Sequence, residues 1–418
     1  MTLPAGKLTP LIALFFIFFA FAFCFRVIWF PITHDQLGYT VAETMLNYQN
    51  GFYRRALVGN LFGPIHNRFF LQLAIAGTYS LCLICPLLII RSFKSGWVPI
   101  LFWIAFFCPF GTALCLKDVL AVRKELFFFL LFYLVTLYNV KSLFGNVLLI
   151  VIGSLIHESF FFLFLPFLVC YHWLNHGKIW HMLTLLATGI TVTILLSVTP
   201  GMPGEVTDLL IDRLVHMGFQ KDQFDGFEYF QKLSFSQNLT NANANLSGLN
   251  PVVYLFLYVG TFGVLYGLSS LSGLRIKFKK PGGLILSLGI ILVMAGALSV
   301  IAMDYGRWLS MGFITSVILL SSQIDSFQST WPRFSATRIL ILIPAILLLL
   351  VIRIPHFSGT TFQWSDWYVV DKAFLASGLF FSSVIAMNPG VGKGSQPGLF
   401  AKLQSFFHVK NKARRNFD

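Results

Sequence analysis

Residues 144–174 read FGNVLLIVIGSLIHESFFFLFLPFLVCYHWL, two apolar runs that meet at the polar pair His157-Glu158. A helix needs roughly 20 apolar residues to cross a bilayer, so this block is either one long span or two short spans that turn at the polar pair. Charge decides between the two, because cytoplasmic loops are enriched in Lys and Arg. Two spans place the basic cluster Arg275 to Lys280 in the cytoplasm, whereas one span places it outside. The sequence therefore predicts two short spans.

The rest of the chain has the same character. Of its 418 residues 56% are hydrophobic and only 11% are charged, and the mean hydropathy is +0.76. Soluble domains carry about 25% charged residues, so soluble enzyme folds and disordered scaffolds are excluded. The apolar residues form long blocks rather than alternating, which favours helices over an outer-membrane barrel. We predict an all-α, polytopic helical membrane protein with a single integral membrane domain over 1–418. About twelve spans are expected, at 8–30, 69–90, 98–116, 126–140, 144–157, 159–174, 180–199, 251–272, 283–303, 308–323, 338–355 and 373–388.

The basic residues predict the orientation of these spans. With the N-terminus, the Arg275–Lys280 loop and the basic tail 389–418 in the cytoplasm, the cytoplasmic segments hold 17 of the 30 basic and two of the 16 acidic residues. Their net charge is +15 and that of the other face is −1, as the positive-inside rule requires. The overall charge of +14 therefore reflects topology, and no nucleic-acid partner is expected.

Two extracytoplasmic loops follow from this orientation. The first, 31–68, carries apolar residues at helical spacing and is expected to contain a helix on the membrane surface. The second, 200–250, is the longest polar stretch of the chain. Its segment Glu205 to Phe219 is either an amphipathic helix or a mobile loop.

Charged residues that a membrane helix disfavours gather on the same predicted outer side. Charges at membrane depth are costly and usually mark a functional site, so we expect these groups to line one outward-opening cavity. They are His34-Asp35, Glu43, Arg54-Arg55, Arg68, Lys117-Asp118, Arg123-Lys124-Glu125, His157-Glu158 and the segment Asp304-Tyr305-Gly306-Arg307-Trp308.

Roles for the first loop follow from side-chain chemistry. Asp35, at the mouth of the first span, could be a general base towards an acceptor hydroxyl, or it could cap the helix that follows. Arg54 and Arg55 could clamp a phosphate or diphosphate through paired hydrogen bonds, or they could anchor the loop to lipid headgroups.

The later clusters allow similar alternatives. Arg123 and Lys124 open the fourth span and could hold phosphate in the same way, or in part be interfacial. His157 beside Glu158 could relay a proton, or the pair could satisfy backbone groups at the helix break. A further pair, Asp304 and Arg307, is three residues apart and could form a purely structural salt bridge or take part in the site.

Several motifs are absent from the sequence. It contains no P-loop, no Cys/His spacing typical of a metal site and no G-x-S-x-G, so ATP-driven transport and hydrolase chemistry have no support, and no cofactor or metal is expected. All six cysteines fall in apolar blocks, which argues against a disulfide framework.

Asp35, followed by Tyr39, Ala42, Gly51 and Arg54-Arg55 after the first span, resembles the GT-C superfamily of polytopic glycosyltransferases. His157-Glu158, Asp304 with Arg307, and the loop 200–250 are similar to features of Wzy-type O-antigen and capsule polymerases. The resemblance implies a bacterial inner-membrane enzyme that takes sugars from an undecaprenyl-linked donor and joins them to a glycan or lipid acceptor at the periplasmic face. Polysaccharide-assembly proteins would be its partners.

The resemblance also implies residue roles. Asp35 would be the base, with Glu158 as the second candidate and His157 beside it. Phosphate or diphosphate would be held by Arg54, Arg55, Arg123, Lys124 and Arg307, the last next to Asp304. The main alternative is a flippase or other secondary transporter of a lipid-linked sugar. Such a transporter is expected to show an internal repeat, and none is evident in the sequence.

Overall fold

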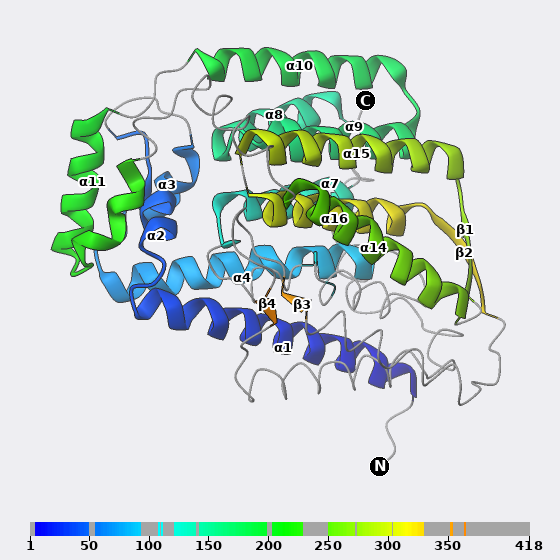
Figure 1. The fold of residues 1–418 in the computed structure, drawn as a ribbon, viewed down its shortest axis with the longest axis horizontal. Coiled ribbons are helices and arrows are strands. Elements are labelled where there is room, and N and C mark those ends of the chain that lie inside the picture. The colour runs from blue at the N-terminus through cyan, green and yellow to red at the C-terminus, as the bar shows by residue number, and fades with distance from the viewer. Residues whose placement is uncertain are drawn as a thin grey trace, which may run out of the picture.

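The computed structural model describes residues 5–49, 55–92, 108, 110–111, 121–138, 142–198, 203–228, 250–271, 274–302, 304–329, 352–353 and 363–364. Helices dominate this part of the chain, which confirms the helical class (Figure 1). The elements are α1 (Ala5–Thr33), α2 (Gly38–Met45), α3 (Leu57–Phe62), α4 (Arg68–Ser92), the 3-10 helix η2 (Lys124–Leu126), α7 (Phe127–Tyr138), α8 (Leu143–Ile156), α9 (Phe160–His176), α10 (Ile179–Ser197), α11 (Gly204–His216), the 3-10 helix η3 (Lys221–Glu228), α14 (Asn250–Leu271), β1 (Leu274–Phe278), α15 (Pro281–Ala302), α16 (Tyr305–Ser322), β2 (Ile324–Ser329), β3 (Ile352–Arg353) and β4 (Gln363–Trp364).

Three helices of the described part are long and apolar enough to cross a membrane: α4, α10 and α15. A fourth span is possible if α1 and α2, which meet at a bend of 98°, are counted as one broken span. Other apolar helices, including α8 and α9, are shorter. The count of about twelve spans therefore stays a prediction.

The predicted helix 98–116 is wrong at its centre. Cys108, Phe110 and Gly111 form a turn, closed by a 2.7 Å hydrogen bond from the Gly111 amide to the Cys108 carbonyl. The sequence Cys108-Pro109-Phe110-Gly111 explains it, because proline at the second and glycine at the fourth position favour a β-turn. The predicted helix 338–355 is also wrong at its end, where Ile352–Arg353 form β3 paired with β4. The other residues of these segments, and the predicted span 373–388, lie outside the described residues.

The break predicted at His157-Glu158 is confirmed. Helix α8 ends at Ile156, the backbone of His157 is extended, and α9 begins at Phe160. The two helices pack against each other, and α9 also contacts α7, α10 and α15. Stacked rings of Phe132, Phe164 and their neighbours fill the space between α7 and α9. The three residues of the break are thus held at the end of a tightly packed group of helices.

The helices α15 and α16 connect two opposite ends of the molecule. At one end, β1 pairs antiparallel with β2, which joins the segments before α15 and after α16. At the other end, Asp304 lies between the two helices. The 22 residues of α15 span about 33 Å at 1.5 Å per residue, close to the thickness of a hydrocarbon core. The strands were not predicted, because Leu274-Arg275-Ile276-Lys277-Phe278 alternates basic and apolar residues and was interpreted as a loop.

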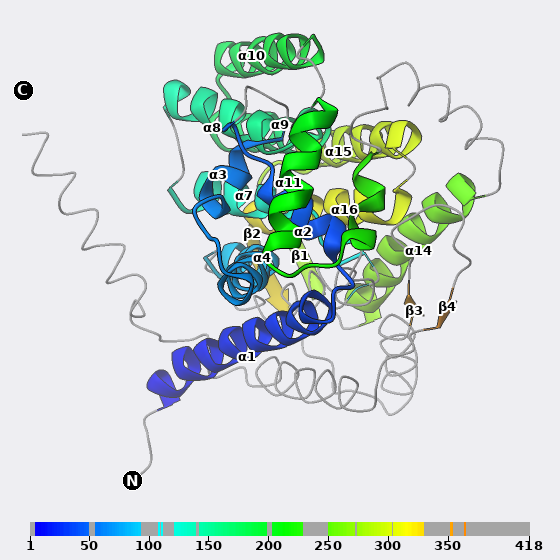
Figure 2. The same ribbon diagram turned by 90° about the vertical axis from the view of Figure 1, so that its left-hand side faces the viewer.

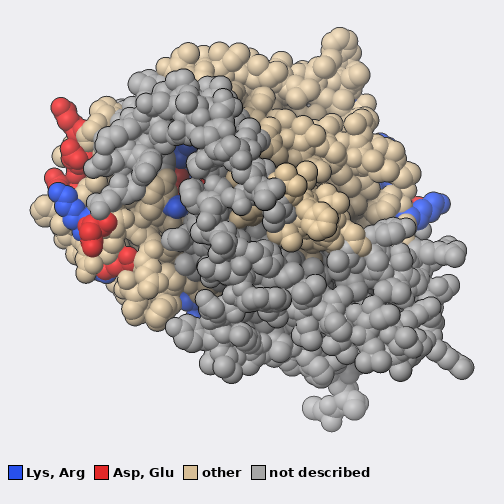
Figure 3. Space-filling model, in the orientation of Figure 1, with Lys and Arg blue, Asp and Glu red and all other residues tan. Residues whose placement is uncertain are grey.

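Surface charge differs between these two ends. Exposed acidic residues of α11 lie at one end, beside α2 and α3, and exposed lysines of β1 and the turn after it lie at the other (Figures 1 and 3). We call the second of these the β end.

The first predicted outer loop is folded into the protein. Helix α2 is the helix expected in this loop, and α3, α4, α11 and η3 pack around it and bury every residue except Tyr39 (Figure 2). The helix expected over Glu205 to Phe219 is confirmed as α11, with Leu210 and Leu214 buried. Leu209, which the helical spacing of the apolar residues in this segment predicts to lie on the same face, is exposed. The apolar face of α11 is therefore narrower than predicted and serves to cover α2.

Candidate functional site

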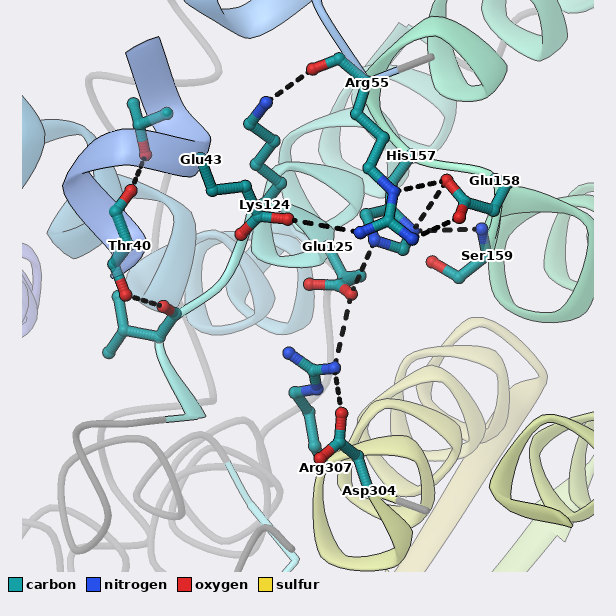
Figure 4. Close-up of polar contacts among 12 residues, drawn as sticks. Thr40, Glu43, Arg55, Lys124, Glu125, His157, Glu158, Ser159, Asp304 and Arg307 are labelled. Carbon is teal, nitrogen blue, oxygen red and sulfur yellow. Dashed lines mark hydrogen bonds and ion pairs between the residues drawn. The ribbon is translucent and has the colours of Figure 1, made fainter. Parts of the chain in front are cut away.

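Polar and charged side chains from five separate segments meet in one group (Figure 4), at the end of the molecule opposite the β end (Figure 1). We call this group the polar network. Its members are Glu43 of α2, Arg55 before α3, Lys124 and Glu125 of η2, His157 and Glu158 of the break between α8 and α9, and Asp304 and Arg307 at the start of α16.

Local backbone structure explains why these residues can face one another. Each network segment lies at a helix end or in a short helix, where the chain turns and side chains are not confined to one helical stripe. Arg123 is extended, and η2 then redirects the chain into α7. His157 is extended between two helices. Arg55 has φ of +66°, a left-handed conformation that non-glycine residues adopt at a cost of about 1–3 kcal/mol, usually where the surrounding structure enforces it.

The most exposed part of the network is the pair Arg55 and Glu158. The Arg55 guanidinium donates two hydrogen bonds to the Glu158 carboxylate, one of them from Nε to Oε2 at 2.6 Å. Its NH1 lies 3.6 Å from Glu43 Oε1. Burial opposes the ionisation of Glu158, but attraction to Arg55 outweighs it and holds the pKa of that carboxyl below its usual range. The Glu158 side chain is nevertheless 37% exposed and that of Arg55 21%.

Lys124 is completely buried beneath this pair. Its ammonium group donates a hydrogen bond to the Arg55 carbonyl. Burial lowers the pKa of Lys124 to about 7, against the attraction of Glu43 and other carboxylates. Lys124 was expected to hold phosphate, but its side chain supports the backbone of Arg55 instead, so its effect on a ligand would be indirect.

His157 has a fixed tautomer. The Ser159 amide donates to His157 Nδ1 at 3.1 Å, so the ring proton is on Nε2, which donates to Glu125 Oε1 at 3.1 Å. Burial and the nearby Arg55 lower the pKa of His157 to about 4, which keeps the ring neutral at pH 7. His157 therefore donates a hydrogen bond to Glu125 and holds that carboxylate in position.

Arg307 links Glu125 to Asp304. Its NH2 group donates to Asp304 Oδ2 and lies 3.6 Å from Glu125 Oε1. The predicted pairing of Asp304 and Arg307 is thereby confirmed. The guanidinium also stacks 4.2 Å from the centre of the Trp308 ring. Beside the network, the Arg123 guanidinium stacks 3.8 Å from the centre of the Tyr39 ring.

Some buried polar atoms of this region have no hydrogen-bond partner within the described part of the chain. They are Glu43 Oε2, Glu125 Oε2, Arg123 NH1, Arg307 Nε and Ser159 Oγ. Buried polar atoms in proteins are nearly always hydrogen-bonded to protein, water or a ligand. The network thus has hydrogen-bond acceptors and donors for further polar groups. In its exposed pair, a carboxylate that can transfer a proton lies beside a guanidinium that can bind an anion.

Asp35 lies apart from these contacts. Both of its carboxylate oxygens are 2.8 Å from Arg68 NH2, and Arg68 also donates to the Gly218 carbonyl. The alternative role of Asp35 as a helix cap is wrong, because the residue before α2 is Leu37 and no side chain caps that helix. The ion pair instead ties the end of α1 to the start of α4 and the residues after α11. Of the other expected site residues, Arg54 lies outside the described residues, as do Lys117 and Asp118.

Sequence reasoning gave no role to two central members of the network. Glu43 and Glu125 were recognised as charges on the predicted outer side, yet both are only 2% exposed and each contacts an arginine. The spacing of Tyr39 and Glu43, four residues apart on one helical face, was the available signal for the first. Nothing in the sequence indicates that Glu125 contacts His157 and Arg307.

Across the described residues, no three His, Cys, Asp or Glu side chains are arranged to hold a metal ion. Comparisons with protein-family models, with curated proteins and with solved structures found no match for this chain.

Proposed function

We propose that this protein is a polytopic membrane glycosyltransferase that joins sugars from a polyprenyl-phosphate-linked or diphosphate-linked donor to a glycan or lipid acceptor. The proposal places the reaction at the periplasmic face of a bacterial inner membrane, in the assembly of a surface polysaccharide such as O-antigen or capsule. The supporting observation is the polar network, in which partly exposed arginine and carboxylate groups meet at the end of the molecule opposite the β end.

The network suits a lipid-linked phosphate donor for two reasons. A planar guanidinium forms paired, charge-assisted hydrogen bonds with phosphate oxygens, and the network contains two guanidinium groups, Arg55 and Arg307, each now paired with a carboxylate. The end of the molecule that carries the network would lie at the membrane interface if α15 crosses the bilayer, which is where the headgroup of a polyprenyl lipid resides. As the glycosidic bond forms, these guanidinium groups would stabilise the charge that develops on the leaving phosphate.

Glu158 is the base that fits this reaction best. It contacts Arg55 directly, so a base and a phosphate ligand would be adjacent. Asp35 remains the alternative from the sequence resemblance, although its two oxygens face Arg68 rather than the network. His157 would act by positioning Glu125.

The test is glycan elongation in membranes supplied with lipid-linked sugar. Glu158→Gln should lower turnover by roughly 100-fold or more while the protein still folds, the range expected for loss of a general base. Arg55→Ala should raise the KM for the donor. Glu205→Gln, which makes the same change on exposed α11, is the matched control. If Glu158→Gln elongates glycan normally and Asp35→Asn does not, the base is Asp35 rather than Glu158.

A flippase of lipid-linked sugars is the second candidate. The observations that favour it are the 98° bend between α1 and α2 and the break between α8 and α9, because transporters often form their substrate sites at broken helices. Transfer of a labelled lipid-linked sugar across the bilayer without any new glycosidic bond would support this candidate against the transferase.

A further inference from the structure

Arg55 and Glu158 are joined by two parallel hydrogen bonds, which we call the fork. The fork occupies the two groups that the proposed reaction needs. The guanidinium surface that would bind phosphate is already used by the carboxylate, and the carboxylate that would take a proton is already neutralised by the guanidinium. We propose that the donor phosphate and Glu158 compete for Arg55, so that donor binding releases Glu158 to act as the base. This inference rests on the proposed function and adds an order of events to it.

The structure indicates which partner moves. Arg55 is held from two sides, since its carbonyl accepts a hydrogen bond from the fully buried Lys124 and its NH1 lies 3.6 Å from Glu43. Its left-handed φ of +66° is a conformation that only such surroundings maintain. Arg55 therefore stays in place during the exchange.

Glu158 is less restrained. It lies in the three-residue break between α8 and α9, and its side chain is the most exposed of the ion-pair partners around Arg55. Its carboxylate accepts the two hydrogen bonds from Arg55, and its next charged or polar side-chain neighbour within the described residues, His157 Nδ1, is 3.9 Å away. A phosphate presents the same fork geometry as a carboxylate and carries as much charge or more, so it can take over both hydrogen bonds.

The exchange changes the chemistry of Glu158. While Arg55 is its partner, the pKa of the carboxyl is held low and both oxygens are occupied. Once phosphate neutralises Arg55, the largest of the effects that lower the pKa of Glu158 is removed, while burial, which raises it, remains. Glu158 then becomes a stronger base at the moment when the donor is in place.

The reaction that follows is balanced without any further reagent. Glu158 accepts the proton of the acceptor hydroxyl, and the oxygen electron pair forms a bond to the anomeric carbon of the donor sugar. The bond from that carbon to the phosphate oxygen breaks, and its electron pair stays on the phosphate held by Arg55. The protonated Glu158 then loses its proton to water, and departure of the polyprenyl phosphate restores the fork.

The experiment measures binding of a fluorescent short-chain prenyl phosphate to the purified full-length protein in detergent micelles. Competition predicts that Glu158→Gln binds the probe about 10-fold more tightly than the wild type, within the range of 5–150-fold typical of coupled equilibria. Glu158→Asp keeps the charge but is one methylene shorter, and it should also bind more tightly because it cannot maintain the fork. Arg55→Ala should lose at least 10-fold in affinity, and the exposed Glu205→Gln should bind as the wild type does.

The outcomes separate this inference from the proposed function. Unchanged or weaker binding by both folded Glu158 variants would overturn the competition, even if the wild type elongates glycan. Tighter binding by Glu158→Gln alone, with Glu158→Asp equal to the wild type, would show a simple charge effect and would also overturn it. Tighter binding by both variants of a protein that forms no glycosidic bond would support the competition and refute the transferase.

Discussion

Glu125 should be the carboxylate whose loss most destabilises the fold, because it is the best buried member of the network that contacts two donors. Its side chain is 2% exposed, accepts the His157 N–H at 3.1 Å and lies 3.6 Å from Arg307. A hydrogen bond to a charged group contributes about 1.5–3 kcal/mol. At an effective dielectric constant of about 20, two unit charges at this separation attract by roughly 4–5 kcal/mol before desolvation is subtracted.

Breaking a buried pair by removing one partner typically costs about 3–5 kcal/mol. Since Arg307 keeps Asp304 as a partner, we expect the lower end, about 3 kcal/mol, for Glu125→Ala. Glu125→Gln keeps an acceptor for His157 and should cost about half as much. Glu158→Ala breaks a pair that is 21% and 37% exposed and should cost about 1 kcal/mol or less.

The assay is reversible unfolding in mixed micelles under increasing denaturing detergent, followed by tryptophan fluorescence. We expect Glu125→Ala to be the most destabilised variant, followed by Glu125→Gln and then Glu158→Ala. Two results would refute the view that Glu125 is held by two donors in a buried site: a loss of unfolding free energy below about 1 kcal/mol for Glu125→Ala, or a loss for Glu158→Ala greater than that for Glu125→Ala.

Three further predictions follow from other parts of the structure. Burial lowers the pKa of Lys124 to about 7, so above that pH the unfolded state binds more protons than the folded state. Wild-type stability should therefore rise from pH 7 towards pH 9, and thermal melts of Lys124→Met should not show this rise. A β-carbon on Gly59 would overlap the Leu46 carbonyl, so Gly59→Ala should lower the melting temperature by several degrees and displace the chain that carries Arg55. Gly77→Ala is the control, because the space around its β-carbon is open and the melting temperature should not fall. Reporter fusions should be active outside the cytoplasm at residue 225 and inside it at residue 278, and the opposite pattern would contradict the proposed orientation.

The sequence predicted the apolar helices well because their signal is local. Runs of apolar residues gave α1, α4, α7 to α10 and α14 to α16 within a few residues of their observed bounds. The break at His157 was predictable because a polar pair inside an apolar block is costly wherever it faces lipid. The amphipathic pattern of α11 was also local, although the sequence could not say that its apolar face would cover α2.

What the sequence could not predict are contacts between distant segments. The strand β1 was missed because its basic residues have the composition of a cytoplasmic loop, and its partner β2 is about 50 residues away in the chain. Asp35 had two plausible roles, and neither included Arg68, whose position depends on how α1 packs on α4. Glu125 could be recognised as a charge, but its partners His157 and Arg307 come from two other parts of the chain.

The most direct test of the proposed function is a single reconstitution. Purified wild-type protein in proteoliposomes is supplied with a labelled polyprenyl-diphosphate sugar and an acceptor, and two products are measured: the lengthened glycan and the labelled lipid that has crossed the bilayer. A glycosyltransferase should form a new glycosidic bond and release the polyprenyl carrier stoichiometrically, and Glu158→Gln should lose both activities. Movement of the labelled lipid to the opposite leaflet, with neither bond formation nor carrier release, would contradict the proposed function.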